Sequence, residues 1–147
     1  NRLGAANVLL TNEWGQVTTN LAGLSYADSF VDTGSNALFF DFAQTTCFGN
    51  GDFYCPPTPW SLTANITGHG GAPTVPVSFS VDNAESLFNQ GYPVLPTLAG
   101  PIGSQPASAP SETFDWGLPF YFGRSVFHGI AGKSTPAKTY TGPFIGF

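Results

Sequence analysis

The segment Asp32-Thr33-Gly34-Ser35 has the residue types needed to hold a reactive carboxylate at a tight turn. Glycine lets the backbone fold back sharply, and a neighbouring hydroxyl can orient the carboxylate by hydrogen bonding. Peptide bonds can be hydrolysed by two such carboxylates that share one proton, because two like charges that close cannot both ionise. We therefore predict Asp32 as a catalytic acid/base. Thr33 and Ser35 are predicted as hydroxyls that position it, and Gly34 as a backbone hinge.

The same four residues also fit an ordinary structural turn, because Asp and Gly are good turn formers. The flanking segments favour the catalytic interpretation. Two strand-like segments, residues 16–21 and 24–31, precede the turn, and a short apolar run at residues 37–40 follows it. The catalytic carboxylate is thus expected at the end of a strand, where the turn exposes it.

Three other acids, Asp28, Asp41 and Asp115, could each be considered as the second carboxylate. None of them lies in a second Asp-Thr-Gly turn. We interpret all three as surface or hydrogen-bonding residues.

The rest of the chain predicts a mostly β domain with little helix. Residues 82–91 form the main helix signal, with capping residues at the start, an acid in the first turn and Gly91 at the end. Residues 96–113 are rich in Pro, Gly, Ser and Ala and predict a long surface loop. A length of 147 residues suits one domain. Further strands are expected at residues 6–10, 60–67, 75–81, 120–122, 125–130 and 144–147.

Cys47 and Cys55 flank a turn-rich segment that contains the hairpin signal Asn50-Gly51. A hairpin would bring the two cysteines side by side, so we predict a disulfide rather than free thiols. A metal site would need further ligands nearby, and we expect neither a metal ion nor a cofactor. A disulfide indicates an oxidising compartment, so we expect a secreted or periplasmic protein.

The composition excludes several classes of partner. The chain has 4 Lys and Arg residues against 9 Asp and Glu, a net charge of −5, so binding to nucleic acid or to an anionic membrane surface is disfavoured. Charged residues make up only 9%, well below the usual quarter or so, as suits a secreted protein. No apolar run approaches the roughly 20 residues of a transmembrane helix. Because the sequence contains no Met, we expect a processed or trimmed product whose signal peptide has been removed.

The segment from Phe114 to Phe120 resembles the apolar-apolar-Gly segment that aspartic proteases place behind their catalytic turn. In this resemblance Gly117 is the glycine whose backbone passes beneath the aspartate loop, and Leu118 beside it supports the site. Asp115 and Trp116 depart from the usual pair of aliphatic residues. Residues 141–147 resemble the closing strand of a pepsin C-terminal lobe. The resemblance implies that residues 1–147 form a single lobe of a pepsin-like, or retropepsin-like, acid protease fold with one or two short helices.

The chain is also similar to a family of exported bacterial proteins described only as a domain of unknown function. Members of that family have two halves, each with an Asp-Thr-Gly or Asp-Ser-Gly turn, and this chain resembles the second half. The resemblance implies that the second carboxylate comes from a missing N-terminal half or from an identical chain, as in retroviral proteases. The segments that carry it are residues 30–40, 53–56, 78–81, 86–88, 114–124, 132–136 and 141–143.

Two functions follow as hypotheses. The first is an exported aspartic endopeptidase-like lobe that acts on peptide or protein substrates. The alternative is a catalytically inactive pepsin-fold module that binds protein or carbohydrate, with Trp14 as the exposed aromatic residue that could stack on a sugar ring. Trp60 and Trp116 are interpreted as core residues. His69 is interpreted as a turn residue and His128 as a core or edge residue rather than metal ligands.

Overall fold

The computed structural model describes residues 3–48, 50–103, 111–137 and 139–147, and these are mostly β as predicted. One α-helix and one 3₁₀ helix accompany the strands. The strands are β1 (Val8–Leu10), β2 (Val17–Leu21), β3 (Leu24–Val31), β4 (Leu38–Phe40), β5 (Thr46–Cys47), β6 (Asn50–Tyr54), β7 (Trp60–Thr67), β8 (Thr74–Val81), β9 (Ala99–Gly100), β10 (Phe114–Trp116), β11 (Phe127–Gly129) and β12 (Phe144–Gly146). The helices are α1 (Ala84–Asn89) and the 3₁₀ helix η1 (Leu118–Tyr121).

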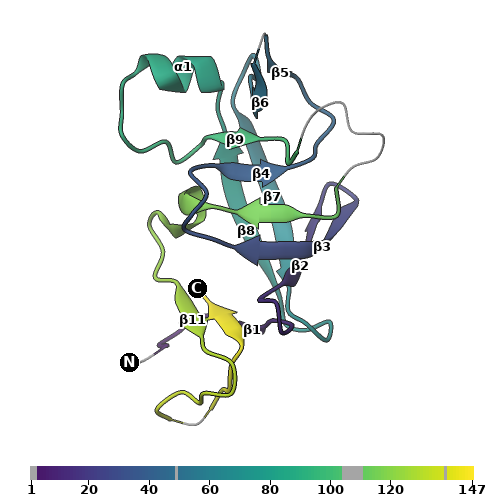
Figure 1. Ribbon diagram of the computed structural model, residues 1–147, viewed down its shortest axis with the longest axis vertical. Helices are drawn as coiled ribbons and strands as arrows, with labels where there is room; N and C mark the ends of the chain where they lie inside the picture. Colours follow the sequence, from purple (N-terminus) through teal and green to yellow (C-terminus); the bar gives the residue numbers. More distant parts are fainter. Residues whose placement is uncertain (1–2, 49, 104–110, 138) are drawn as a thin grey trace.

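The main sheet has seven strands in the order β8-β7-β2-β3-β10-β4-β9. It curls, so that β7 and β8 run across the direction of β3, β4 and β9 (Figure 1). Strand β10 lies between β3 and β4: it runs parallel to β3, with Asp115 opposite Phe30, and antiparallel to β4, with Asp115 opposite Phe39. Strand β10, from late in the sequence, is thereby inserted beside the strand that leads to Asp32.

Stacked aromatic side chains from β4 and β10 form part of the core. The Phe114 ring lies 4.5 Å from the Phe40 ring and 4.3 Å from the Trp116 ring between centroids. Trp116 is buried, and its indole N–H donates to Thr19 Oγ1 over 2.9 Å, so the one polar atom of this side chain is satisfied. Trp116 is therefore a core residue as predicted, and Trp60 packs half-buried against the same core.

A second, three-stranded sheet has the order β1-β12-β11. It lies at the opposite end of the molecule from α1, and the C-terminus is near it (Figure 1). None of the described helices is long and apolar enough to cross a membrane.

The local signals in the sequence predicted several elements correctly. Cys47 and Cys55 form a disulfide with a Cα–Cα distance of 4.8 Å, across the hairpin of β5 and β6. The Asn-Gly pair lies at the start of β6 rather than in the turn itself. Helix α1 has Asn83 as its N-cap, whose side chain accepts a hydrogen bond from the Ser86 N–H.

Two predictions for the second half of the chain were wrong. Residues 120–122 were expected as a strand, but Leu118–Tyr121 form η1, because Pro119 at the start of the turn has no N–H for a sheet and fits the first helical turn. The expected loop of residues 96–113 contains β9, which pairs parallel with β4 through Leu38 and Ala99. Residues 104–110 of that loop lie outside the described residues.

Candidate functional site

Asp32 follows β3, and the turn after it holds its carboxylate. The Gly34 N–H donates to Asp32 Oδ1 over 2.7 Å, and Ser35 Oγ lies 3.1 Å from Asp32 Oδ2. The Asp32 N–H donates to the Trp116 carbonyl, which ties the turn to β10. Thr33, in contrast, is exposed, and within the described part of the chain its hydroxyl forms no hydrogen bond. The structure thus brings Asp32, Gly34 and Ser35 together and leaves Thr33 outside this cluster.

Gly117 lies directly beneath this turn. A Cβ atom at position 117 would be only 2.0 Å from the Ala37 carbonyl oxygen and 2.8 Å from the Ser35 carbonyl oxygen. The next residue, Leu118, donates its N–H to the Ser35 carbonyl over 2.7 Å. The close backbone approach expected at Gly117 is therefore present, and it leaves no room for a side chain.

Asp115 is the residue whose placement differs most from the expectation. It is hydrogen-bonded, as predicted, but it is not on the surface: only 5% of it is exposed. Its Oδ2 lies 2.5 Å from Ser35 Oγ, the same hydroxyl that reaches Asp32. Ser35 therefore joins two carboxylates that are far apart in the sequence.

Asp41 is also buried rather than on the surface. Its two carboxylate oxygens accept hydrogen bonds from the N–H groups of Ile102 and Ser111. It thereby links Ile102 and Ser111, which belong to two separate described stretches of the chain. Asp28 is exposed on β3, as predicted.

The surroundings of the two carboxylates raise the pKa values of Asp115 and Tyr121. Burial raises the pKa of Asp115, the nearby Asp32 charge raises it further, and the Ser35 hydrogen bond opposes both. Burial also raises the pKa of Tyr121 on η1, with additional contributions from the charges of Asp32 and Asp115. The Tyr121 hydroxyl lies 2.9 Å from His128 Nε2. Tyr121 and His128, neither of which the sequence assigned to the site, thus flank the carboxylates.

An open cavity of about 320 Å³ adjoins Asp32. Trp14 stands at its edge with 78% of its surface exposed, as predicted from its position in a turn. The other residues that line it are Thr11, Gly15, Phe30, Val31, His128, Gly129, Pro143, Phe144 and Ile145. Asp32, the residue predicted to be reactive, therefore lines an open groove that has both polar and apolar walls.

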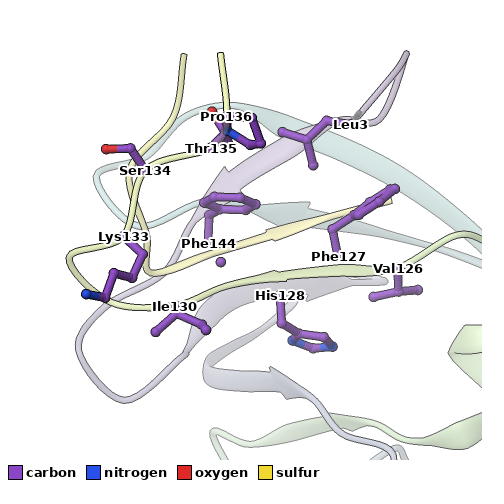
Figure 2. Close-up of a pocket in the computed structure, with 11 residues that line it drawn as sticks. Leu3, Val126, Phe127, His128, Ile130, Lys133, Ser134, Thr135, Pro136 and Phe144 are labelled. Atoms are coloured by element: carbon purple, nitrogen blue, oxygen red, sulfur yellow. The ribbon is translucent and has the colours of Figure 1, made fainter. Parts of the chain in front are cut away.

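A second cavity, of about 400 Å³, lies against β11 and the C-terminal loop. Figure 2 shows Leu3, Phe127 and Phe144 on one side of β11 and His128 pointing away from them, as strand alternation requires. His128 is a residue of an edge strand, in agreement with the prediction. Its ring is hydrogen-bonded to Tyr121, and the residue lines both this cavity and the Asp32 cavity.

Among the described residues, one group of potential metal ligands lies close together, formed by Cys47, Cys55 and Glu85. Its two sulfur atoms are joined in the disulfide and are not available as thiolates.

Over residues 1–147 the sequence matches a family whose description is a protein of unknown function, DUF3443. No curated protein and no solved structure matches the chain.

Proposed function

The chain thus belongs to DUF3443, a family of unknown function, and we propose that it is a pepsin-like lobe of an exported aspartic endopeptidase in which Asp32 is a catalytic carboxylate. The observation that carries the proposal is the geometry of the turn. One Asp32 oxygen accepts a hydrogen bond from the Gly34 N–H, the other lies next to the Ser35 hydroxyl, and Asp32 is among the residues that line an open groove. A carboxylate held in this way is oriented before substrate arrives.

In the proposed reaction, Asp32 and a second aspartate share one proton across the substrate. The ionised carboxylate takes a proton from water as the water oxygen attacks the peptide carbonyl, and the protonated carboxyl donates to the carbonyl oxygen. The resulting tetrahedral species collapses with proton transfer to the amine that leaves. Water is consumed, and no covalent bond forms with the protein.

The second aspartate would come from a missing N-terminal lobe or from a second copy of this chain. Either arrangement requires the surface around Asp32 to pack against a partner, which apolar residues favour. The groove beside Asp32 supports this part of the proposal, since the exposed Trp14 and the half-buried Phe30 and Val31 line it. A peptide substrate would lie between the two lobes.

The exposed Trp14 ring favours a second candidate function. With 78% of its surface exposed beside the Asp32 groove, it could stack on a sugar ring or on a partner's side chain. In that case the chain would be an inactive binding module, and Trp14→Ala would abolish binding to a polysaccharide panel while Asp32→Asn would leave binding unchanged.

The proposed peptidase is tested by cleavage of an unfolded protein substrate at acidic pH. We expect Asp32→Asn to lower the cleavage rate by about 10²–10⁴-fold, the usual contribution of a general acid or base. Asp28→Asn is the matched control, because Asp28 lies on the same chain segment but is exposed on β3. Cleavage that survives Asp32→Asn, or that an inhibitor mimicking the tetrahedral species does not block, would contradict the proposal. A rate that rises with the square of chain concentration would identify the partner as a second copy.

A further inference from the structure

Asp115 is a second carboxylate, and it lies on the far side of the Ser35 hydroxyl from Asp32. Ser35 Oγ lies 3.1 Å from Asp32 Oδ2 and 2.5 Å from Asp115 Oδ2. Both distances are within hydrogen-bonding range. A serine hydroxyl, however, carries one hydrogen and can donate to only one of the two carboxylates.

The count of hydrogens determines the protonation of this cluster. If both carboxylates were ionised, one of the two contacts would place a hydroxyl lone pair against an anionic oxygen with no hydrogen between them. A proton on one carboxyl group removes this repulsion, because that carboxyl then donates to Ser35 Oγ and the Ser35 hydrogen is available to the other. The cluster therefore contains one carboxylate and one neutral acid.

The surroundings of the two groups decide which of them holds the proton. Asp115 is 5% exposed, and within the described part of the chain its buried Oδ1 accepts no hydrogen bond. A buried carboxylate oxygen without a donor is unfavourable in its charged form. Asp32 is only half-buried, and its other oxygen already accepts the Gly34 N–H. The negative charge is therefore more favourable on Asp32, and the proton on Asp115.

None of the described ionisable groups that face Asp115 is a cation that could stabilise its charged form. Asp32 lies beyond Ser35, and the charges of Asp32 and Asp115 both contribute to raising the pKa of Tyr121 on η1. Asp52 of β6 lines a cavity with Asp115, together with Phe39, Phe53 and Ile102. Strand β4, which pairs with β10, has no titratable residue. The Arg124 guanidinium is turned to the carbonyls of Phe120 and Ser78 instead.

We propose that Asp115 keeps a proton in the resting site and donates a hydrogen bond to the Ser35 hydroxyl, which in turn donates a hydrogen bond to the Asp32 carboxylate. Asp115 is a positioning residue that acts through Ser35. Combined with the proposed peptidase function, on which this step rests, the arrangement makes Asp32 the ionised member of the catalytic pair. The second lobe's aspartate is then the protonated member, which donates to the substrate carbonyl.

The protonation of Asp115 can be measured without any substrate. In protein with ¹³C-labelled aspartate, Asp115→Asn identifies the Asp115 carboxyl signal by removing it. We expect the Asp115 carboxyl signal to titrate at a higher pH than the ordinary aspartate value of 3.8, and to titrate at lower pH in Asp32→Asn, where the neighbouring charge is absent. An Asp115 carboxyl that titrates at or below the ordinary value in the unmodified protein would overturn the proposal.

Stability gives a second readout with a defined sign. Because the pKa of Asp115 is raised from 3.8, its proton stabilises the folded state fully below about pH 3.8, and this contribution is lost as the pH rises. Asp115→Asn keeps a donor toward Ser35 but does not titrate. The stability of the unmodified protein relative to Asp115→Asn should therefore fall as the pH is raised from about 3.8. A difference that does not change with pH would contradict the proposal.

Cleavage assays separate this proposal from the peptidase proposal. Asp115→Leu removes the donor to Ser35, and we expect it to cleave about 10- to 100-fold more slowly than Asp115→Asn, as for loss of one hydrogen bond that supports a charged group. If Asp32→Asn abolishes cleavage but the two Asp115 variants cleave equally, the role of Asp115 is overturned and the peptidase function stands. If the protein cleaves no substrate but the Asp115 carboxyl titrates above the ordinary aspartate value, the peptidase function fails and the assignment of the proton to Asp115 stands.

Discussion

Replacing Gly117 by alanine tests whether the close approach of β10 to the Asp32 turn holds the site together. The backbone of Gly117 has φ −68° and ψ −162°, which alanine can adopt, so the cost is one of space alone. The added methyl group would lie 2.0 Å from the Ala37 carbonyl oxygen and 2.8 Å from the Ser35 carbonyl oxygen. Both obstacles are backbone atoms, which cannot move aside as the end of a flexible side chain can.

The magnitude follows from these contacts. Overpacking by one methyl group costs about 1–3 kcal/mol, and contacts with backbone on two sides place this site at the upper end. The lower entropy of the unfolded alanine chain returns about 0.4–1 kcal/mol. We expect Gly117→Ala to lower the free energy of unfolding by about 2 kcal/mol or slightly more. For a chain of this length that corresponds to a fall in Tm of roughly 4–8 °C.

The assay is urea unfolding followed by fluorescence of the three tryptophans, with Gly51→Ala as the matched control. A Cβ atom at position 51 would meet nothing within 4 Å, and Gly51 does not have a positive φ. The control should therefore be as stable as the unmodified protein or more stable by up to about 1 kcal/mol. If Gly117→Ala is within about 0.5 kcal/mol of the control, within the scatter of a neutral surface change, the packing argument is refuted.

Two further predictions concern other parts of the structure. The double variant Cys47→Ser, Cys55→Ser opens a loop with a sequence separation of 8 residues. We therefore expect its free energy of unfolding, measured in urea, to be lower by about 2.5 kcal/mol. If a reductant added to the unmodified protein leaves its free energy of unfolding unchanged, this prediction is contradicted. Burial, and then the charge of Asp41, raise the pKa of Tyr26 to about 12, so the stability due to its neutral phenol is complete below about pH 10 and is lost as the pH rises through 12. The alkaline loss of stability should be smaller in Tyr26→Phe, and an equal loss in the two proteins would show that Tyr26 does not titrate in this way.

Sequence reasoning succeeded where the signal is local. Residues 60–67 alternate in the manner of a half-buried strand and form β7 with the predicted bounds. Asn83 can cap a helix because its side chain reaches an N–H three residues away, and this needs no tertiary contact. Cys47 and Cys55 are linked through a hairpin that closes on itself. In each case the physical cause lies within a few residues of the feature.

It failed where distant segments decide the conformation. Residues 99–100 have a loop composition, yet they pair with β4 and become β9. The segment 120–122 has the aromatic content of a strand, but Pro119 and the end of β10 set a 3₁₀ turn that reaches Tyr121. Both outcomes depend on partners that sequence periodicity does not identify.

The candidate site divides in the same way. The sequence by itself determined the turn at Asp32, because the small residues after the aspartate permit a tight backbone and place the Gly34 N–H and Ser35 hydroxyl next to its carboxylate. Only the tertiary structure decided that Asp115 joins it. Ser35 and Asp115 are 80 residues apart, and they meet because β10 is inserted between β3 and β4. An acid between two aromatic residues, as in Phe114-Asp115-Trp116, is unusual for a strand and can be seen in the sequence. Its contact with Ser35, however, depends on the strands on either side of β10.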